Sequence, residues 1–241
     1  MFRSLCRGLG DLVYPPFCFA CQSALRAEER PLLLCHLCLQ SISWNRSPAC
    51  PKCSRYLGPH PQTVLCSGCR RQKLYFDFAW SACLFEEPLR GLIHQFKFQE
   101  RRFLYKLFSR MMLDFISRNG LDIGQFDILV PMPLSAAKYR ERGYNQAQLL
   151  AAPIARAHRK LMLTSLLQRS RYTPSQTSLS RKNRFTNVRG SFRINPRVPI
   201  TNKNILIIDD LLTTGASASE ASFCLKARGA AKVGVLTLAI V

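Results

Sequence analysis

The chain has no long hydrophobic run. No apolar stretch in its 241 residues reaches the roughly 18 residues that a membrane-spanning helix requires. The first residues, MetPheArgSerLeuCysArgGly, lack the long apolar core of a secretory signal. These absences predict a soluble cytoplasmic protein with no membrane span. With 47% apolar residues, the chain is long enough for one complete α/β domain and a small accessory module.

Acidic residues are scarce: 14 Asp and Glu face 35 Lys and Arg, which gives a formal net charge of +21. The excess is uneven, because residues 76–125 hold seven basic and six acidic residues, whereas residues 138–203 hold fifteen basic residues and one acid, Glu141. Such a block favours a polyanionic partner, since each neutralised phosphate releases counterions. A solvated basic surface that keeps the protein soluble is the alternative, and charge alone leaves it open.

The sequence also lacks the Gly-x4-Gly-Lys-Ser/Thr motif that a P-loop nucleotide site requires. This matters because the most informative segment, IleLeuIleIleAspAspLeuLeuThrThrGlyAlaSer at 205–217, is a strand that ends in acids, as in a Walker B site. Without a P-loop, that interpretation is disfavoured. A tight turn between a strand and a helix would explain Gly215, but not two adjacent acids before a hydroxyl-rich turn.

The same segment suits a ribose that carries a 5′-phosphate. Asp209 and Asp210 can accept hydrogen bonds from two vicinal hydroxyls, and the backbone amides that follow, at the positive end of the next helix, can surround a phosphate. Hydroxyl side chains add donors, and the glycine lets the backbone approach closely. The predicted phosphate-binding residues are Leu212, Thr213, Thr214, Gly215, Ala216 and Ser217.

Eight of the eleven cysteines form four Cys-x2-Cys pairs, a spacing that favours metal over disulfides. Two such pairs complete a tetrahedral four-cysteine zinc site, so the chain is expected to hold two structural zinc ions. Sequential pairing closes the shortest loops, although spacing leaves a cross-braced arrangement open. An iron-sulfur centre is less favoured. His36 lies inside the second pair and is expected to be a bystander. The expected ligands are Cys18, Cys21, Cys35, Cys38, Cys50, Cys53, Cys66 and Cys69.

Periodicity in the remainder predicts alternating strands and helices. Aromatic residues from Phe76 onward predict a strand or hairpin, and helices are expected from Pro88 and over 101–119, the latter ending at Gly120. Buried strands are expected over 126–131, 161–163 and 232–241. On the first helix, Lys97 is a candidate phosphate contact, with a solvated lysine as the alternative, and His94 is expected on the helix surface.

Two basic segments could contact phosphate groups. Loop signals at Pro131, Pro133 and Gly143 predict a loop before a helix that begins near Tyr144. Its cations could hold a pyrophosphate through charge-assisted hydrogen bonds: Lys138, Arg140 and Arg142. The long polar stretch over 168–190 could form a lid over a bound ligand, with a disordered surface loop as the alternative. Its candidate ligand residues are Gln176, Arg181, Arg184 and Asn187.

The segment that ends in AspAspLeuLeuThrThrGlyAlaSer resembles the phosphoribosyl pyrophosphate (PRPP) loop of type I phosphoribosyltransferases, and the order of strands, basic segment and lid is similar to theirs. The resemblance implies an α/β fold with a parallel sheet flanked by helices and the ligand at the carboxyl ends of the strands. It also implies that Asp209 and Asp210 are the catalytic acids and that magnesium accompanies PRPP. The expected domains are a double zinc-ribbon module at 1–75 and a phosphoribosyltransferase-like domain at 76–241, with a helical segment at 88–120, a core at 126–241 and a lid at 168–190.

Together, the cysteine pairs, ArgGlyTyrAsnGlnAla at 142–147, the polar stretch and the AspAsp segment resemble the ComF family of bacterial competence proteins, also called ComF/GntX. Membership implies a cytoplasmic role in natural transformation, in which the protein handles incoming single-stranded DNA beside DNA-uptake or replication-restart proteins. Ser217 stands where many relatives have Thr, so the hydroxyl is retained. An active phosphoribosyltransferase that uses PRPP and magnesium with an unidentified acceptor is the alternative. The sequence shows no readable nucleobase pocket for it.

Overall fold

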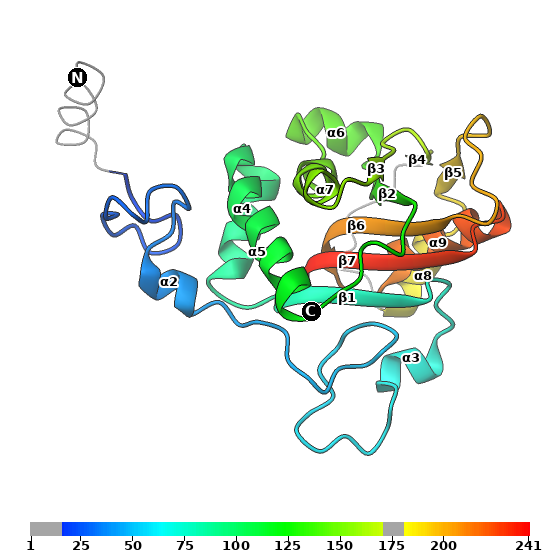
Figure 1. Cartoon of the computed structure of the whole chain (residues 1–241), viewed down its shortest axis with the longest axis horizontal. Helices are drawn as coiled ribbons and strands as arrows, with labels where there is room; N and C mark the ends of the chain where they lie inside the picture. Colours follow the sequence, from blue (N-terminus) through cyan, green and yellow to red (C-terminus); the bar gives the residue numbers. More distant parts are fainter. Residues whose placement is uncertain (1–15, 171–180) are drawn as a thin grey trace.

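The centre of the protein is a five-stranded parallel sheet with strand order β1-β7-β6-β2-β3. The computed structural model describes residues 16–170 and 181–241 (Figure 1). The strands, in sheet order, are β1 (Phe78–Leu84), β7 (Lys232–Ile240), β6 (Asn204–Leu212), β2 (Ile128–Pro131) and β3 (Leu161–Met162). Their near-continuous apolar sequences fit a sheet that is covered on both faces.

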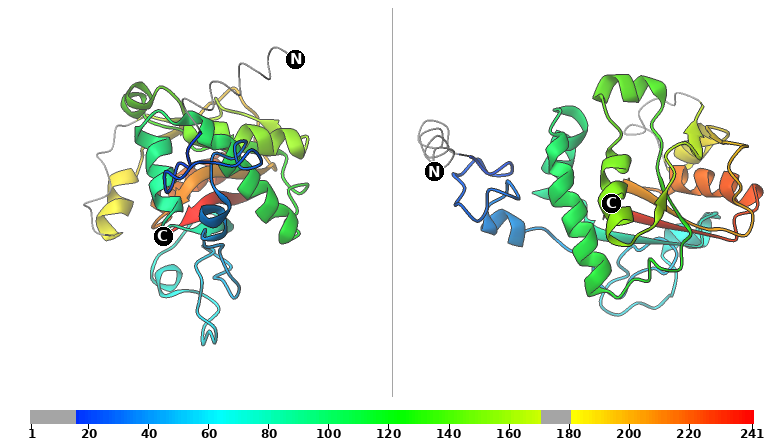
Figure 2. Two further views of the ribbon diagram at one scale, coloured as in Figure 1. Left: turned by 90° about the vertical axis from the view of Figure 1, so that its left-hand side faces the viewer. Right: turned by 45° about the horizontal axis from the view of Figure 1, so that its top comes forward.

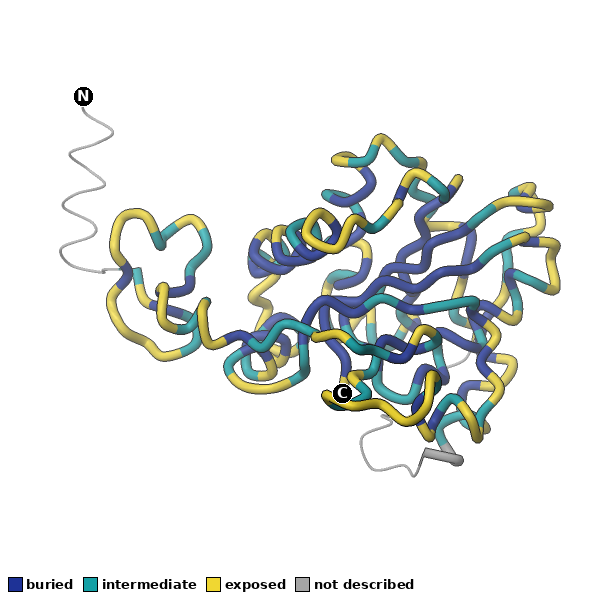
Figure 3. The backbone as a smooth tube through the Cα atoms, turned by 60° about the horizontal axis from the view of Figure 1, so that its bottom comes forward, coloured by how far each residue is buried: buried dark blue, intermediate teal, exposed yellow. Residues whose placement is uncertain are grey.

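Side chains of the central strands alternate between two hydrophobic layers, as the two-residue period of a strand requires. Leu206 and Ile208 of β6 pack in the layer that contains three helices, whereas Ile205 and Ile207 pack in the opposite layer. The first layer is built with α4 (Leu89–Phe98), α5 (Tyr105–Arg118) and α7 (Gln146–Ala157). The opposite layer is built with α9 (Ala216–Ala227). Figure 3 shows the buried strands between these exposed coverings.

Shorter elements surround the carboxyl ends of the strands. The short helix α6 (Ala136–Arg142) follows β2. Strands β4 (Leu167–Arg169) and β5 (Phe192–Ile194) pair antiparallel, and helix α8 (Arg181–Val188) lies between them in the sequence. A single 3-10 turn, η1 (Arg102–Leu104), precedes α5. None of the helices in the described ranges is long and apolar enough to cross a membrane.

The two cysteine-rich units lie at different places on the sheet domain (Figures 1 and 2). The first contains α2 (His36–Gln40) and packs on α4 and η1, where the rings of Phe19 and Phe103 lie 5.1 Å apart. The second contains α3 (Ser67–Arg71) and packs below β1. There the backbone N–H of Ser81 donates a 3.1 Å hydrogen bond to Ser54 Oγ. Both units therefore contribute to the hydrophobic layers of the domain.

The parallel α/β architecture confirms the fold predicted from the sequence, and the expected strands and helices are present. One local prediction was wrong: the segment with Lys138, Arg140 and Arg142 is helix α6, not a loop. Ser135 caps this helix with its hydroxyl, and Gly143 ends it with a φ of 72°. The predicted continuous polar loop at 168–190 was also wrong at both ends, which belong to β4 and α8. Its residues 171–180 lie outside the described ranges.

Candidate functional site

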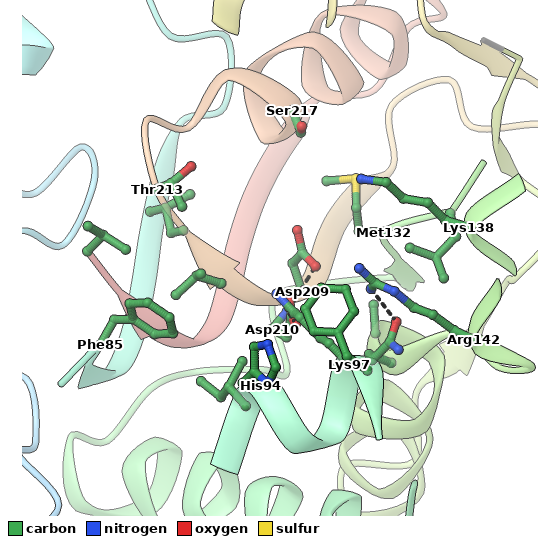
Figure 4. Close-up of a pocket in the computed structure, with 18 of the residues that line it drawn as sticks. Phe85, His94, Lys97, Met132, Lys138, Arg142, Asp209, Asp210, Thr213 and Ser217 are labelled. Atoms are coloured by element: carbon green, nitrogen blue, oxygen red, sulfur yellow. Dashed lines mark hydrogen bonds and ion pairs between the residues drawn. The ribbon is translucent and has the colours of Figure 1, made fainter. Parts of the chain in front are cut away.

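A cavity of about 870 Å³ opens at the carboxyl ends of β2 and β6. Its floor holds the acids of β6, one side is formed by the turn into α9, and α6 and α4 supply the other walls. Figure 4 shows Lys138 and Arg142 reaching toward the acids from the side opposite Thr213. This is the position at which open α/β sheets bind ligands.

The floor of the cavity is an acid pair joined to a lysine. Asp210 Oδ2 lies 2.6 Å from Lys97 Nζ, and both side chains are largely buried, with exposures of 9% and 17%. The backbone N–H of Asp210 donates a 2.9 Å hydrogen bond to Asp209 Oδ1, which fixes the first carboxylate beside the second. One charge of the pair is therefore balanced within the protein by a cation from α4.

The pKa of Asp209, the other acid of the pair, lies well above the usual range of a carboxyl. Burial and the negative charge of Asp210 together raise the pKa of Asp209 to about 7, although the charge of Lys97 acts in the opposite direction. A carboxyl with a pKa near 7 accepts hydrogen bonds best above neutral pH and can donate one below it. The protonation state of the floor thus depends on pH.

The turn between β6 and α9 exposes backbone to the cavity. Gly215 adopts a φ of 78°, a left-handed conformation that residues with a side chain rarely adopt, and immediately precedes α9. A Cβ atom there would lie 3.4 Å from Phe76 Cε1. The hydroxyl of Thr214 accepts a hydrogen bond of 3.4 Å from the N–H of Ala216. The start of a 12-residue helix and its glycine together form an anion-binding geometry.

The opposite wall is positively charged. Lys138 and Arg142 are four residues apart on α6, so both face the cavity, and Arg169 joins them from β4. Burial lowers the pKa of Lys138, and the neighbouring charges of Arg169 and Arg142 lower it further. Cations that repel one another at a cavity wall are arranged for an anionic ligand.

The ArgGlyTyrAsnGlnAla motif holds these walls together. Arg142 Nη1 donates a 3.0 Å hydrogen bond to Gln146 Oε1, and Asn145 Oδ1 accepts one of 3.0 Å from the N–H of Ala147, which caps α7. Asn145 Nδ2 also donates to the carbonyl of Met132 at 3.0 Å. The hydroxyl of Tyr144 donates to the carbonyl of Phe96 and so links this motif to α4.

The structure brings most of the predicted site residues to one cavity. Those that line it are Lys138, Arg142, Arg184, Asp209, Asp210, Leu212, Thr213, Gly215, Ala216 and Ser217. Arg140 is exposed on α6 and, like Thr214 and Asn187, is not among the residues that line it. The backbone of Arg181 begins α8, and Gln176 lies outside the described ranges. Lys97, a candidate phosphate contact, instead pairs with Asp210.

Sequence reasoning missed an aromatic wall beside α4. His94 and Phe98 stack with ring centroids 4.9 Å apart, and the Arg142 guanidinium lies 4.9 Å from the centre of the Phe98 ring. Phe85 also lines the cavity, and Figure 4 shows it on the far side of His94 from Arg142. The spacing of His94 and Phe98 on one helix face is visible in the sequence, but only the fold directs that face to the cavity.

The cysteines form two groups of four, confirming sequential pairing. Cys18, Cys21, Cys35 and Cys38 form one group, and Cys50, Cys53, Cys66 and Cys69 form the other; within each, the sulfur atoms all lie within 4.8 Å of one another. A tetrahedral zinc ion with bonds of about 2.3 Å requires sulfur separations of about 3.8 Å. The distances of 3.7 Å from Cys21 to Cys35 and 3.5 Å from Cys53 to Cys66 therefore fit zinc.

Comparisons with known proteins agree with these features. A double zinc ribbon domain model matches residues 9–72. The DNA utilization protein YhgH of Escherichia coli K12 is 28% identical over 94% of this chain and 98% of its own length. Competence protein F of Haemophilus influenzae is 27% identical over 92% and 96%, and competence protein ComFC of Bacillus subtilis is 29% identical over 89% and 85%.

Among solved structures, one described as an analysis of an invariant aspartic acid in HPRTs (glutamic acid mutant) is 15% identical. It covers 58% of this chain and 67% of its own, with a TM-score of 0.31, and a likeness at that score supports no conclusion by itself. The chain is therefore similar over nearly its whole length to proteins named DNA utilization protein and competence protein, and a double zinc ribbon precedes its parallel α/β domain.

Proposed function

We propose that this protein handles single-stranded DNA in the cytoplasm during natural transformation, and that its α/β domain binds a 5′-phosphorylated ribose such as PRPP. A single observation carries the ligand assignment: one cavity combines the acids Asp209 and Asp210, the turn at the start of α9, and the cations Lys138 and Arg142. A phosphorylated sugar presents hydroxyl donors and anionic oxygens together, so it matches this combination of groups.

Each part of such a ligand has a complementary part of the cavity. The turn from Thr213 to Ser217 suits the 5′-phosphate, because the N-terminus of α9 offers backbone N–H donors and Gly215 presents no side chain. The carboxylate of Asp209 accepts hydrogen bonds from ribose hydroxyls. Lys138 and Arg142 on the opposite wall suit the pyrophosphate, where Arg142 can donate two parallel hydrogen bonds.

The acid pair also fits a magnesium ion. Magnesium prefers oxygen ligands and is commonly held by one or two carboxylates together with substrate phosphates, which matches Asp209 and Asp210 at the floor of a phosphate site. When bound, the ion would neutralise pyrophosphate oxygens. Because Lys97 already balances Asp210, we expect Asp209 to supply the stronger interaction with magnesium.

The role in DNA handling is supported by charge and by the relatives. Residues 138–203 carry fifteen basic residues and one acid, which favours a polyanion. The relatives named above are called DNA utilization protein and competence protein. We infer that this basic block contacts the DNA backbone. The phosphosugar site would then either bind a regulatory phosphosugar or bind a nucleotide phosphate.

Calorimetry with PRPP, with and without magnesium, tests the ligand assignment. We expect wild-type protein to bind PRPP, and the variant Asp209→Asn, Asp210→Asn to lose at least about tenfold in affinity, since hydrogen bonds to charged groups contribute about 1.5–3 kcal/mol each. Loss of zinc from the variant would indicate misfolding, so zinc content is the control. A wild-type protein that takes up no PRPP at any magnesium concentration would overturn the assignment.

DNA handling is tested separately with a labelled single-stranded oligonucleotide. We expect its affinity to fall with salt by about 0.7 logarithmic units per decade for each phosphate contacted. An affinity that does not change with salt, or no binding at low salt, would contradict this part of the proposal and leave the ligand assignment untouched.

A transferase is the second candidate, and the aromatic wall favours it. Phe85, His94 and Phe98 border cavity space beyond the acid pair, where an acceptor could lie beside the ribose. In that reaction a nucleophile forms a bond to the anomeric carbon, the bond to pyrophosphate breaks, and the leaving oxygen retains the electron pair. The nucleophile's proton passes to solvent.

Pyrophosphate release from PRPP and magnesium measures this activity. Candidate acceptors are added one at a time, and the Asp209→Asn, Asp210→Asn variant serves as the control. Release in wild type that is lost in the variant would support a transferase. Equal release in both proteins, or none with any acceptor, would favour a binding protein that has retained the fold without the reaction.

A further inference from the structure

Two exposed aromatic residues form a pair where the second zinc ribbon meets α9. The rings of Tyr75 and Phe223 lie 4.9 Å apart and are inclined by 59°, and the residues are 37% and 44% exposed. Single exposed hydrophobic residues are common on protein surfaces. A ring contact between residues 148 positions apart in sequence, 75 and 223, is instead a feature of the fold.

The backbone holds Tyr75 in an outward orientation. Its N–H donates a 3.1 Å hydrogen bond to Ser219 Oγ on α9, and its neighbours Leu74 and Phe76 are buried, at 7% and 0% exposure. Burial of these two neighbours leaves Tyr75 on the surface between them. Leu74 and Phe76 also lie against Gly215, so the pair sits on the outer side of the turn that enters α9.

Cations surround the pair on the ribbon side. Lys73 Nζ lies 5.5 Å from the centre of the Tyr75 ring, and the exposed Arg70 and Arg71 end α3 just before it. In Figure 1 the chain runs from α3 upward to the edge of the sheet beside α9. The sequence contains no acid from residue 30 to residue 76. This surface therefore combines positive charge with exposed rings.

The acids near this surface already interact with other groups of the protein. Asp77 lies 2.7 Å from Lys226 Nζ and accepts a 2.7 Å hydrogen bond from the N–H of Val233. On α9, Glu220 lies one turn before Phe223 and accepts a 2.7 Å hydrogen bond from the N–H of Gly190. Their charges are partly balanced by these interactions and do not cancel the ribbon cations.

We propose that Tyr75 and Phe223 form a base-stacking platform for single-stranded DNA, and that Arg70, Arg71 and Lys73 bind its phosphates. Exposed rings bind unpaired bases of any sequence, and neighbouring cations follow the backbone, which is how proteins bind single strands without sequence preference. The inference rests on the proposed role in DNA handling and specifies a surface for it that is separate from the phosphosugar cavity, because none of these five residues lines that cavity.

The test uses the full-length zinc-loaded protein and a labelled oligodeoxythymidine of about 16 nucleotides, the upper range for one single-strand binding unit. The variant Tyr75→Leu, Phe223→Leu keeps apolar packing and removes the rings. We expect its affinity to fall at least about tenfold, because stacking contributes about 1–3 kcal/mol per base. The salt dependence should not change, since no charge is removed. Phe17→Leu, at a 46% exposed phenylalanine in the first ribbon, is the matched control and should bind like wild type.

A second pair of variants tests the cations. Arg70→Gln, Arg71→Gln should reduce the slope of log affinity against log salt by about 1.4, which is about 0.7 for each phosphate that the variant no longer neutralises. Arg102→Gln, Lys106→Gln removes the same charge from exposed positions in η1 and at the start of α5, and should leave the slope unchanged. Equal slopes in the two variants would show only an effect of net charge and would overturn the cation assignment.

The outcomes separate this surface from the wider proposal. No binding of the oligonucleotide by wild type would overturn both the surface and the role in DNA handling. Wild-type binding that the Tyr75→Leu, Phe223→Leu variant fully retains would overturn the surface alone. Binding of an RNA oligonucleotide of equal length, with none of DNA, would contradict the assignment to DNA. Normal PRPP binding and zinc content in the variant would show that it is folded, so that weaker DNA binding reflects the loss of the rings.

Discussion

Lys97 Nζ lies 2.6 Å from Asp210 Oδ2, and this ion pair joins α4 to the carboxyl end of β6. Lys97 lies on α4, and Tyr144 also contacts this helix, because its hydroxyl donates a hydrogen bond to the carbonyl of Phe96. The acid at the floor of the cavity is therefore paired before any ligand binds. Because both side chains are largely buried, removal of either one has consequences for folding as well as for binding.

Replacement of Lys97 with methionine should destabilise the protein. The variant leaves Asp210 buried without its cation, which costs about 3 kcal/mol of unfolding free energy, and a second substitution to Asn at position 210 should recover much of that loss. Chemical denaturation of Lys97→Met, Asp210→Asn and the combined variant at neutral pH measures the coupling. Additive effects in this cycle would mean that the two residues do not interact in solution.

Binding of PRPP should depend on the ionisation of Asp209. Because the pKa of this group is raised to about 7, ribose hydroxyls and magnesium meet an ionised carboxylate only above neutral pH. We expect affinity to weaken by up to about tenfold for each pH unit below 7. Asp209→Asn should bind weakly at all pH values. Any pH dependence of affinity that remains in this variant comes from the phosphates of the ligand, whose second proton dissociates with a pKa of about 6.

Asp209 should also make folding stability depend on pH, in the direction opposite to that of PRPP affinity. The folded state holds the proton of Asp209 more tightly than the unfolded chain does, so its contribution is fully present below about pH 4 and is lost as pH rises toward 7. Asn at position 209 mimics the protonated acid. The stability advantage of Asp209→Asn over wild type should thus be larger at pH 8 than at pH 5, as measured by thermal unfolding. A uniform effect at both pH values would contradict the raised pKa.

Much of the site can be predicted because its signals are local in sequence. The acids Asp209 and Asp210 end a buried strand and precede a glycine turn, so strand, acids and turn are read from adjacent residues. The zinc groups are equally readable, since each pair closes a short loop and sequential pairing follows from chain entropy. These features depend little on the rest of the fold.

The errors and omissions arise where tertiary packing decides. The sequence groups Lys138, Arg140 and Arg142 as one basic loop, but on α6 successive residues turn by about 100°, which places Arg140 away from the other two. Ser135 before this helix and Gly143 after it are common in loops as well as at helix ends, so the pattern alone does not identify the helix. His94 and Phe98 look like an ordinary helix surface until α4 is placed against the cavity.

Zinc removal should affect the two ribbons differently. Lys52, in the second ribbon, donates hydrogen bonds to the carbonyls of Phe76 and Asp77, and Phe76 packs behind Gly215. We expect Cys50→Ser to lose about one zinc ion per chain and to weaken PRPP binding. Cys18→Ser should also lose about one ion but weaken PRPP binding less, because the first ribbon packs on α4 and η1 near Phe103 rather than behind the turn that contains Gly215. Metal analysis and calorimetry measure both quantities, and equal PRPP affinity in the two variants would contradict the expected difference.

Substitution of Gly215 with alanine should separate an effect on ligand affinity from an effect on folding stability. Alanine there must adopt a φ near 78°, which strains the turn, and its Cβ would contact Phe76 Cε1 at 3.4 Å, so we expect the turn to move to relieve the strain. Gly120, at a φ of 57° with open space around it, provides a control with similar backbone strain. Both Gly215→Ala and Gly120→Ala should lose about 1 kcal/mol of unfolding free energy. Only Gly215→Ala should lose affinity for ribose 5-phosphate, by about tenfold or more, since its backbone N–H groups no longer converge on the phosphate. If both variants bind ribose 5-phosphate like wild type, the phosphate lies elsewhere in the cavity. The cations of α6 would then be the next candidate for the phosphate site, because together with Arg169 they place positive charge on the opposite wall of the cavity.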